Sequence, residues 1–266
     1  MTYEDRREEP ADVAEGDGIA CSIRKGVATL SLNRPARRNA ISEKMFVRLR
    51  ELVREFGRDE SARLVVIRSM TPGCFCAGAD VRTMADPRPE ELARQFTLLI
   101  ECVDALRSAP MPIVTVVDGD CLGAGCTVAA ASDIVVAHEA ARFALPEVFL
   151  GIAPVLAMGA LAPVVSPRSL AYWSATGRWI SSAEAREAGL ATLVLGDDEF
   201  EAGVAELIRD VASIEPSAQR SVKRAATTLA APITMQVRER LMEEMIATAS
   251  HPAARTAIER FLSRKR

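Results

Sequence analysis

Two glycine-rich turns, each placed after a strand-like run, determine the expected fold of this chain: CFCAGADV at residues 74–81 and DGDCLGAGC at residues 118–126. The β-branched runs at 64–67 and 113–117 that precede them are typical of buried strands. Small residues let a ligand approach the backbone, and amides at a strand end or helix start can bind developing negative charge. Two such amides converging on one oxygen would form an oxyanion hole, whereas a tight turn needing positive φ is the plain structural alternative for each.

Outward from these turns, strand-like and helix-like stretches alternate up to about residue 197. An alternating pattern at 19–23 and 27–32 predicts a hairpin, and Ser42 is a good N-cap for a helix that ends at Gly57. Further strands are expected at 113–117, 134–137, 142–145 and 191–195, and further helices begin near residues 89, 125 and 182. We therefore predict a disordered acidic tail at 1–17, an α/β core at 18–197 and an all-helical segment at 198–266.

Composition excludes several classes of protein. The 266 residues carry 33 Lys and Arg against 36 Asp and Glu, a net charge of -3, which argues against a protein that coats nucleic acid or an anionic membrane. No apolar run approaches the length needed to span a bilayer, and the acidic N-terminus lacks the apolar region of a secretory signal. We expect a cytoplasmic protein with no nucleic-acid or membrane partner.

The six cysteines are expected to be free, buried thiols, because disulfides are rare in a long cytosolic chain. Cys74 and Cys76 form a C-x-C pair, but the only histidines, His138 and His251, are not at ligand spacing from it. No metal site is therefore predicted.

Seven sequence blocks, in order and spacing, closely resemble the crotonase superfamily, also called the enoyl-CoA hydratase/isomerase superfamily. The resemblance runs from about residue 19 to the C-terminus. The blocks are LNRP with NAI (32–35, 39–41), FCAGAD (75–80), GAGC (123–126), SDI (132–134), F with PEV and LG (143, 146–148, 150–151), TGR with AEA and GL (176–178, 183–185, 189–190) and FL (261–262).

The resemblance implies a spiral of repeated ββα units with a C-terminal helical trimerisation segment, giving a homotrimer or a homohexamer. The sequence agrees at one point, since the helical tail carries apolar stripes that a monomer would leave uncovered. These stripes consist of Leu241, Met245, Ile258, Phe261 and Leu262.

The resemblance also implies an acyl-CoA thioester substrate, as in fatty acid metabolism, with coenzyme A as part of the substrate and no separate cofactor. The backbone N–H groups of Ala77 and Ala124 would hold the thioester oxygen as it becomes enolate-like. The residues implied to bind substrate or CoA are Arg37, Arg38, Ala40, Ala77, Gly78, Ala79, Asp80, Gly123 and Ala124. Asp80 has a second interpretation as a cap of the following helix.

The expected mechanism depends on carboxylates. The family's hydratases use two glutamates, but here only Glu147 matches, and the other position is Thr127, whose hydroxyl cannot act as a general acid or base near neutral pH. The family's isomerases similarly keep only the later glutamate, which favours movement of a double bond from a 3-enoyl to a 2-enoyl thioester. Downstream, Val155 and Leu156 replace a glycine-rich turn and should narrow the acyl pocket.

Three alternatives stay open at this point. Decarboxylation of a carboxylated acyl thioester would need the oxyanion hole and no strong base, and enoyl-CoA hydration would need Thr127 to hold a water. From a different class, a non-catalytic acyl-CoA-binding protein would keep the fold and lose the chemistry.

Overall fold

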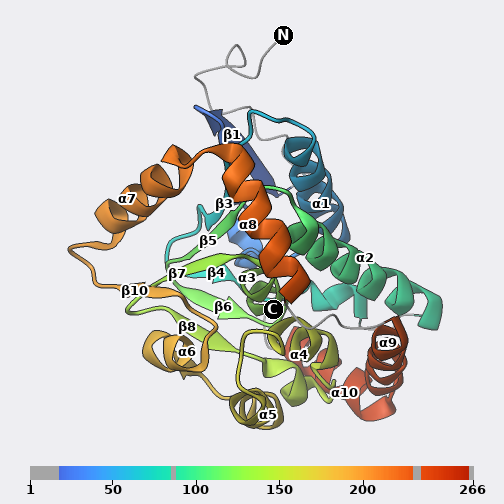
Figure 1. Cartoon of the computed structure of the whole chain (residues 1–266). Coiled ribbons are helices and arrows are strands. Elements are labelled where there is room, and N and C mark those ends of the chain that lie inside the picture. Colours follow the sequence, from blue (N-terminus) through green and yellow to red (C-terminus); the bar gives the residue numbers. More distant parts are fainter. Residues whose placement is uncertain (1–17, 85–87, 230–234, 264–266) are drawn as a thin grey trace.

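The ordered elements begin with the strand that follows Gly18, in a computed structural model that describes residues 18–84, 88–229 and 235–263 (Figure 1). The predicted disordered tail at 1–17 lies outside the described residues. The division at residues 197 and 198 stays a prediction, although the described chain from Phe200 onward is helical in every regular element.

The larger sheet has six strands in the order β1, β2, β3, β5, β7, β10. Their bounds are β1 (Ile19–Arg24), β2 (Val27–Leu32), β3 (Leu64–Ser69), β5 (Ile113–Val117), β7 (Ile134–His138) and β10 (Leu193–Leu195). The β1–β2 hairpin is antiparallel, as predicted, and every other pair in this sheet is parallel. Side chains alternate between the faces: Val66 packs toward α7 (Phe200–Ser213), while Val65 joins the main core.

The smaller sheet explains why the two glycine-rich turns lie side by side. It has the order β4, β6, β8, β9, with β4 (Cys74–Cys76), β6 (Asp120–Leu122), β8 (Arg142–Ala144) and β9 (Ile180–Ser181). Strands β4, β6 and β8 are parallel, and each follows a strand of the larger sheet directly. The repeat is thus strand, strand, helix, which confirms the crotonase-type α/β fold and adds short strands where the sequence indicated only turns.

The helices lie around the sheets, most of them to the right of the strands or below them in the view of Figure 1. They are η2 (Pro35–Arg37), α1 (Glu43–Gly57), η3 (Val81–Met84), α2 (Pro89–Ser108), α3 (Ala124–Ala131), η4 (Pro146–Leu150), α4 (Val155–Leu161), α5 (Pro167–Thr176), α6 (Ser182–Ala188), α8 (Pro216–Leu229), α9 (Met235–Ala249) and α10 (Pro252–Ser263). Ser42 caps α1 as predicted, because its Oγ accepts from the Met45 N–H at 3.3 Å. The helices predicted from the sequence do not include residues 146–161, where the structure has two short helices, η4 and α4, each entered through a proline.

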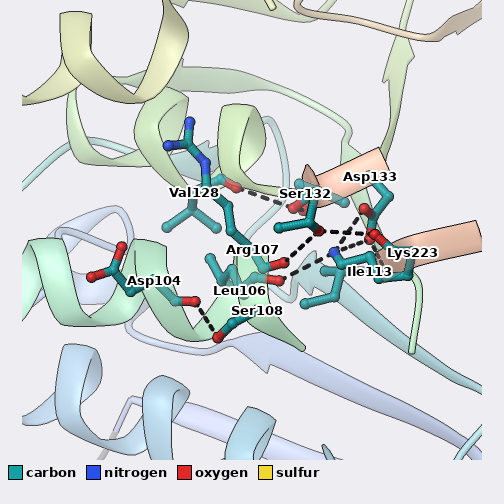
Figure 2. Close-up of polar contacts among 11 residues, drawn as sticks. Asp104, Leu106, Arg107, Ser108, Ile113, Val128, Ser132, Asp133 and Lys223 are labelled. Atoms are coloured by element: carbon teal, nitrogen blue, oxygen red, sulfur yellow. Dashed lines mark hydrogen bonds and ion pairs between the residues drawn. The ribbon is translucent and has the colours of Figure 1, made fainter. Parts of the chain in front are cut away.

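A buried ion pair fixes α8 to the core (Figure 2). Lys223 is 5% exposed, and its ammonium donates to both carboxylate oxygens of Asp133, at 2.6 and 2.7 Å, and to the Leu106 carbonyl at 3.3 Å. Asp133 also accepts from the Ile113 N–H at 2.8 Å. This ion pair therefore joins α8, the end of α2 and the start of β5.

The C-terminal helices pack back onto their own chain. Helix α9 contacts α2 and α4, and α10 contacts η3 and η4. Met245 is 6% exposed, Ile258 is fully buried, and Leu241 and Leu262 pack against the main core, so only Phe261 of the predicted stripes is exposed. The argument that a monomer leaves these stripes uncovered is therefore wrong, since the chain's own core covers them. The trimer or hexamer itself stays a prediction.

Candidate active site

The first glycine-rich turn runs from the end of β4 to Asp80, and a single parallel bridge to Ile41 sets its orientation. The Ile41 N–H donates to the Gly78 carbonyl at 2.8 Å, and the Asp80 N–H donates to the Ile41 carbonyl at 3.0 Å. Because amides alternate in direction along an extended strand, the N–H of Ala79, between these two bonds, points away from Ile41.

This geometry corrects the amide expected at the first turn. The Ala77 N–H donates to the Arg38 carbonyl at 2.9 Å, so it is already used within the protein and is not free for a ligand. Ala79, which the sequence placed only among binding residues, has the N–H directed away from the Ile41 bridge. The alternation of amide direction could have indicated this, but only once the partner strand of the turn is known.

The second turn lies between β6 and α3. Gly123 has a φ of +48° and donates its N–H to the Ala144 carbonyl at 3.0 Å, which anchors the turn to β8. Ala124 is the first residue of α3, so its N–H has no acceptor within the helix. The structure thus leaves the Ala124 amide at a helix N-terminus, where partial positive charge favours an anion.

The two turns and the Glu147 carboxylate converge at Gly123. A methyl group at Gly123 would lie 2.6 Å from Oε1 of Glu147 and 3.7 Å from Cα of Gly78. Only a residue without a side chain fits between them, and its positive φ also favours glycine. These contacts bring three of the predicted site residues, distant in sequence, to one place.

Glu147 lies in the first turn of η4, whose helical geometry was not expected from the sequence. The side chain is only half-buried overall, but its Oε2 atom is buried without a hydrogen-bond partner among the described residues. Burial raises the pKa of Glu147 from its ordinary value of 4.5 to about 7, with only its own backbone N–H acting in the opposite direction. A carboxyl with such a pKa can both accept and return a proton near neutral pH.

Thr127 does not provide a second acid or base. It is 2% exposed, and its hydroxyl donates to the Gly123 carbonyl one helical turn earlier, at 3.1 Å. It lines a cavity that Leu156 also lines, on the side of α3 that faces α2, α4 and α9. The narrowing of an acyl pocket by Val155 and Leu156 stays a prediction.

The loop expected to hold CoA is built on a buried asparagine. Asn39 is fully buried with φ of +55°; its Oδ1 accepts from the Arg34 N–H at 2.8 Å, and its Nδ2 donates to Ser69 Oγ at 2.8 Å. Arg37 and Arg38 are exposed on this loop, and Arg38 is paired with Asp120 at 2.8 Å. Two cations therefore face solvent beside the turns.

Asp80 caps the following helix η3, as its second interpretation predicted, because its Oδ1 accepts from the Arg82 N–H at 3.4 Å. Ion pairs with Arg82 and with Arg34, at 2.5 and 2.9 Å, hold the pKa of Asp80 at about 2. Arg34 also donates to the Ala40 carbonyl at 2.9 Å, so Asp80 and Ala40 fix the loop to the first turn. Direct contact of Asp80, Ala40, Arg37 or Arg38 with a ligand stays a prediction.

Further features of the described residues bear on the expectations for metals, thiols and membranes. All six cysteines are free, and five of them are buried. Within residues 18–84, 88–229 and 235–263, no group of three or more His, Cys, Asp and Glu side chains could hold a metal ion. In the same ranges, no helix combines the length and the apolarity that crossing a membrane requires.

Comparison with known proteins gives a consistent result. The profile of the family described as enoyl-CoA hydratase/isomerase matches residues 22–266. The chain is 31% identical over 203 residues to 1,2-epoxyphenylacetyl-CoA isomerase of Escherichia coli, covering 73% of this chain and 76% of that protein. It is 30% identical over 211 residues to mitochondrial methylglutaconyl-CoA hydratase of Mus musculus, covering 76% of this chain and 66% of that protein. The crystal structure of an enoyl-CoA hydratase from Mycobacterium avium has a TM-score of 0.83 and 28% identity, over 93% of this chain and 96% of that chain.

Proposed function

Because the chain belongs to the enoyl-CoA hydratase/isomerase family, we propose that it moves the double bond of a 3-enoyl-CoA thioester to the 2-position, with Glu147 as its single proton carrier. One observation carries this proposal: the Glu147 carboxylate, with a pKa of about 7, lies where the two glycine-rich turns meet. The threonine at the position of a second glutamate has its hydroxyl directed to a backbone carbonyl.

The reaction divides into two proton transfers. The ionised Glu147 removes a proton from C2 of the thioester, and the electron pair moves toward the carbonyl to form a dienolate. Protonated Glu147 then returns the proton to C4, so that the double bond ends between C2 and C3. The carboxylate is regenerated and no water is consumed, which is why one carboxyl group is sufficient.

The backbone amides of Ala79 and Ala124 stabilise the dienolate oxygen in this proposal. Both are rigidly held, Ala79 between the two hydrogen bonds of the Ile41 bridge and Ala124 at the start of α3. Preorganised donors of this kind contribute roughly 10²–10³-fold each to turnover. Arg37 and Arg38 would attract the phosphates of CoA.

Hydration is the second candidate, favoured by relatives that are named as hydratases. It needs a group that positions and activates water beside Glu147, and the Thr127 hydroxyl donates elsewhere.

A panel of 2-enoyl, 3-enoyl and carboxylated CoA esters separates the candidates. Isomerisation leaves the mass unchanged and is read by chromatography against standards, whereas hydration adds the mass of water and decarboxylation releases CO2. We expect isomerisation alone, and Glu147→Gln should lower its rate by at least about 100-fold while CoA-ester binding persists. Unchanged turnover in that variant would refute the assignment, and no change in any ester would indicate a binding protein.

A further inference from the structure

A cavity of about 40 Å³ lies between helices α2, α3, α4 and α9, outside the proton-transfer site. One water needs roughly 10–15 Å³, so the cavity has room for about three atoms of that size, as many heavy atoms as a carboxylate contains. Apolar side chains form much of its wall, among them Leu99, Val103, Leu156 and Leu241.

Three charged side chains also line this cavity, and their charges do not cancel. Arg238 forms a two-bond ion pair with Asp104, one bond of which is 2.8 Å long. Arg107 donates to the Ala160 carbonyl at 2.6 Å, and among the described residues no carboxylate lies within ion-pairing distance of its guanidinium. The cavity therefore has one net positive charge, located on Arg107.

The position of Arg107 distinguishes it from an ordinary surface arginine. Figure 2 shows its side chain extending away from the nearby Lys223 and Asp133, so it takes no part in that buried ion pair. Burial lowers the pKa of Arg107; the nearby Asp104 carboxylate opposes this shift, and the positive Arg238 acts in the same direction as burial. An anion that binds a guanidinium in such surroundings gains more interaction free energy than one that binds a fully hydrated guanidinium.

The cavity is placed to meet the far end of an acyl group. Thr127 lines it and lies one turn of α3 beyond Gly123, beside which the Glu147 carboxylate lies. One helical turn advances about 5.4 Å, so the cavity is one turn further along α3 than the reacting carbons of the thioester. A substituent that continues past those carbons would therefore approach Arg107.

We propose that this cavity binds the terminal carboxylate of the acyl group and that Arg107 is its recognition residue. The substrates are then thioesters of dicarboxylic acids, and the apolar walls hold the methylene carbons between the two ends. This inference rests on the proposed function for the place of the reacting carbons, but its test does not require turnover.

Binding of saturated CoA esters, which cannot isomerise, tests the proposal by calorimetry. Succinyl, glutaryl and adipyl esters are compared with butyryl, valeryl and hexanoyl esters, which have a methyl group in place of the terminal carboxylate. We expect the wild-type protein to bind at least one carboxylated ester about tenfold or more tightly than its methyl partner. No preference at any chain length would overturn the proposal, and this comparison needs no variant.

Variants then assign the preference to one side chain. Arg107→Met should abolish the preference for the carboxylated ester without weakening the binding of the methyl-terminated ester. Arg107→Lys should retain part of the preference. Arg94→Met is the matched control, because Arg94 lies on the same helix and pairs with Glu43 at the surface. A preference that survives Arg107→Met would overturn the assignment. If the preference is found but no 3-enoyl ester isomerises, only the proposed function fails; if uncharged esters isomerise and no preference is found, only this inference fails.

Discussion

Glu147→Gln should make the protein more stable at alkaline pH while it removes turnover. Burial raises the pKa of Glu147 from 4.5 to about 7, so the folded protein binds this proton more tightly than the unfolded chain does. The contribution of Glu147 to wild-type stability is therefore greatest below about pH 4.5 and is lost as the pH rises through about 7, where the folded protein must hold a buried charge. Glutamine never ionises and avoids this loss.

The magnitude follows from the same two pKa values. At about 1.4 kcal/mol per pKa unit, the difference between 4.5 and about 7 corresponds to about 3 kcal/mol. The free energy of unfolding of Glu147→Gln, minus that of wild type, should therefore rise by about 3 kcal/mol between about pH 4.5 and about pH 8.5. Other titrating groups, such as Asp80, are common to both proteins and cancel in this comparison.

Urea unfolding followed by tryptophan fluorescence measures this difference, since Trp173 is 3% exposed in the folded protein. Protein concentration is held constant, so that any self-association affects both proteins alike. Glu60→Gln, at an exposed position, is the matched control and should show no pH-dependent difference. A stability difference for Glu147→Gln that does not change with pH would refute the raised pKa and with it the proton-carrier role.

Four further predictions follow from the geometry. The kcat/KM for isomerisation should rise as pH increases through about 7, because the ionised Glu147 starts the reaction; a profile flat between about pH 5 and 9 would exclude it as the base. Gly123→Ala places a methyl group 2.6 Å from Glu147 Oε1, so kcat should fall about 100-fold, and unchanged kinetics would show that the carboxylate is not at this position. Thr127→Val removes a hydroxyl bonded within α3 and should cost less than about 1 kcal/mol with turnover kept, whereas a loss of about 100-fold would indicate a catalytic water held there. Asp133→Ala leaves Lys223 buried without its partner and should lower the free energy of unfolding in urea by about 3–5 kcal/mol. Adding Lys223→Met to this variant should recover most of the lost stability. A loss of stability that the second substitution does not reduce would contradict the pairing.

Local signals predicted much of the fold because short-range interactions determine it. The Ser42 N-cap needs only the three residues that follow it, and the β1–β2 hairpin needs only its own alternation and turn. Strands β4 and β6 were not expected, because three-residue strands have too few side chains to show a period.

The site shows the same division between local and distant determinants. Glu147 and the two turns were predicted from the resemblance, but the choice between Ala77 and Ala79 depends on hydrogen bonds to Arg38 and Ile41, about 40 residues earlier in the chain. Arg107 carries no motif that would single it out from the sequence. Only the packing of α4 and α9 against α2 places it in a cavity.

The packing of the C-terminal helices also has a consequence for the order of events during synthesis. Gly151, which ends the segment carrying Glu147, would touch Cα of Ala254 at 3.2 Å if it had a side chain, and the Ala153 N–H donates to Thr248 at 3.2 Å. Both contacts come from residues roughly a hundred positions later, so a ribosome must translate almost the entire message before Glu147 acquires its native support. A nascent chain that stalls in α9 carries every predicted catalytic residue but lacks the α10 contact that supports Gly151.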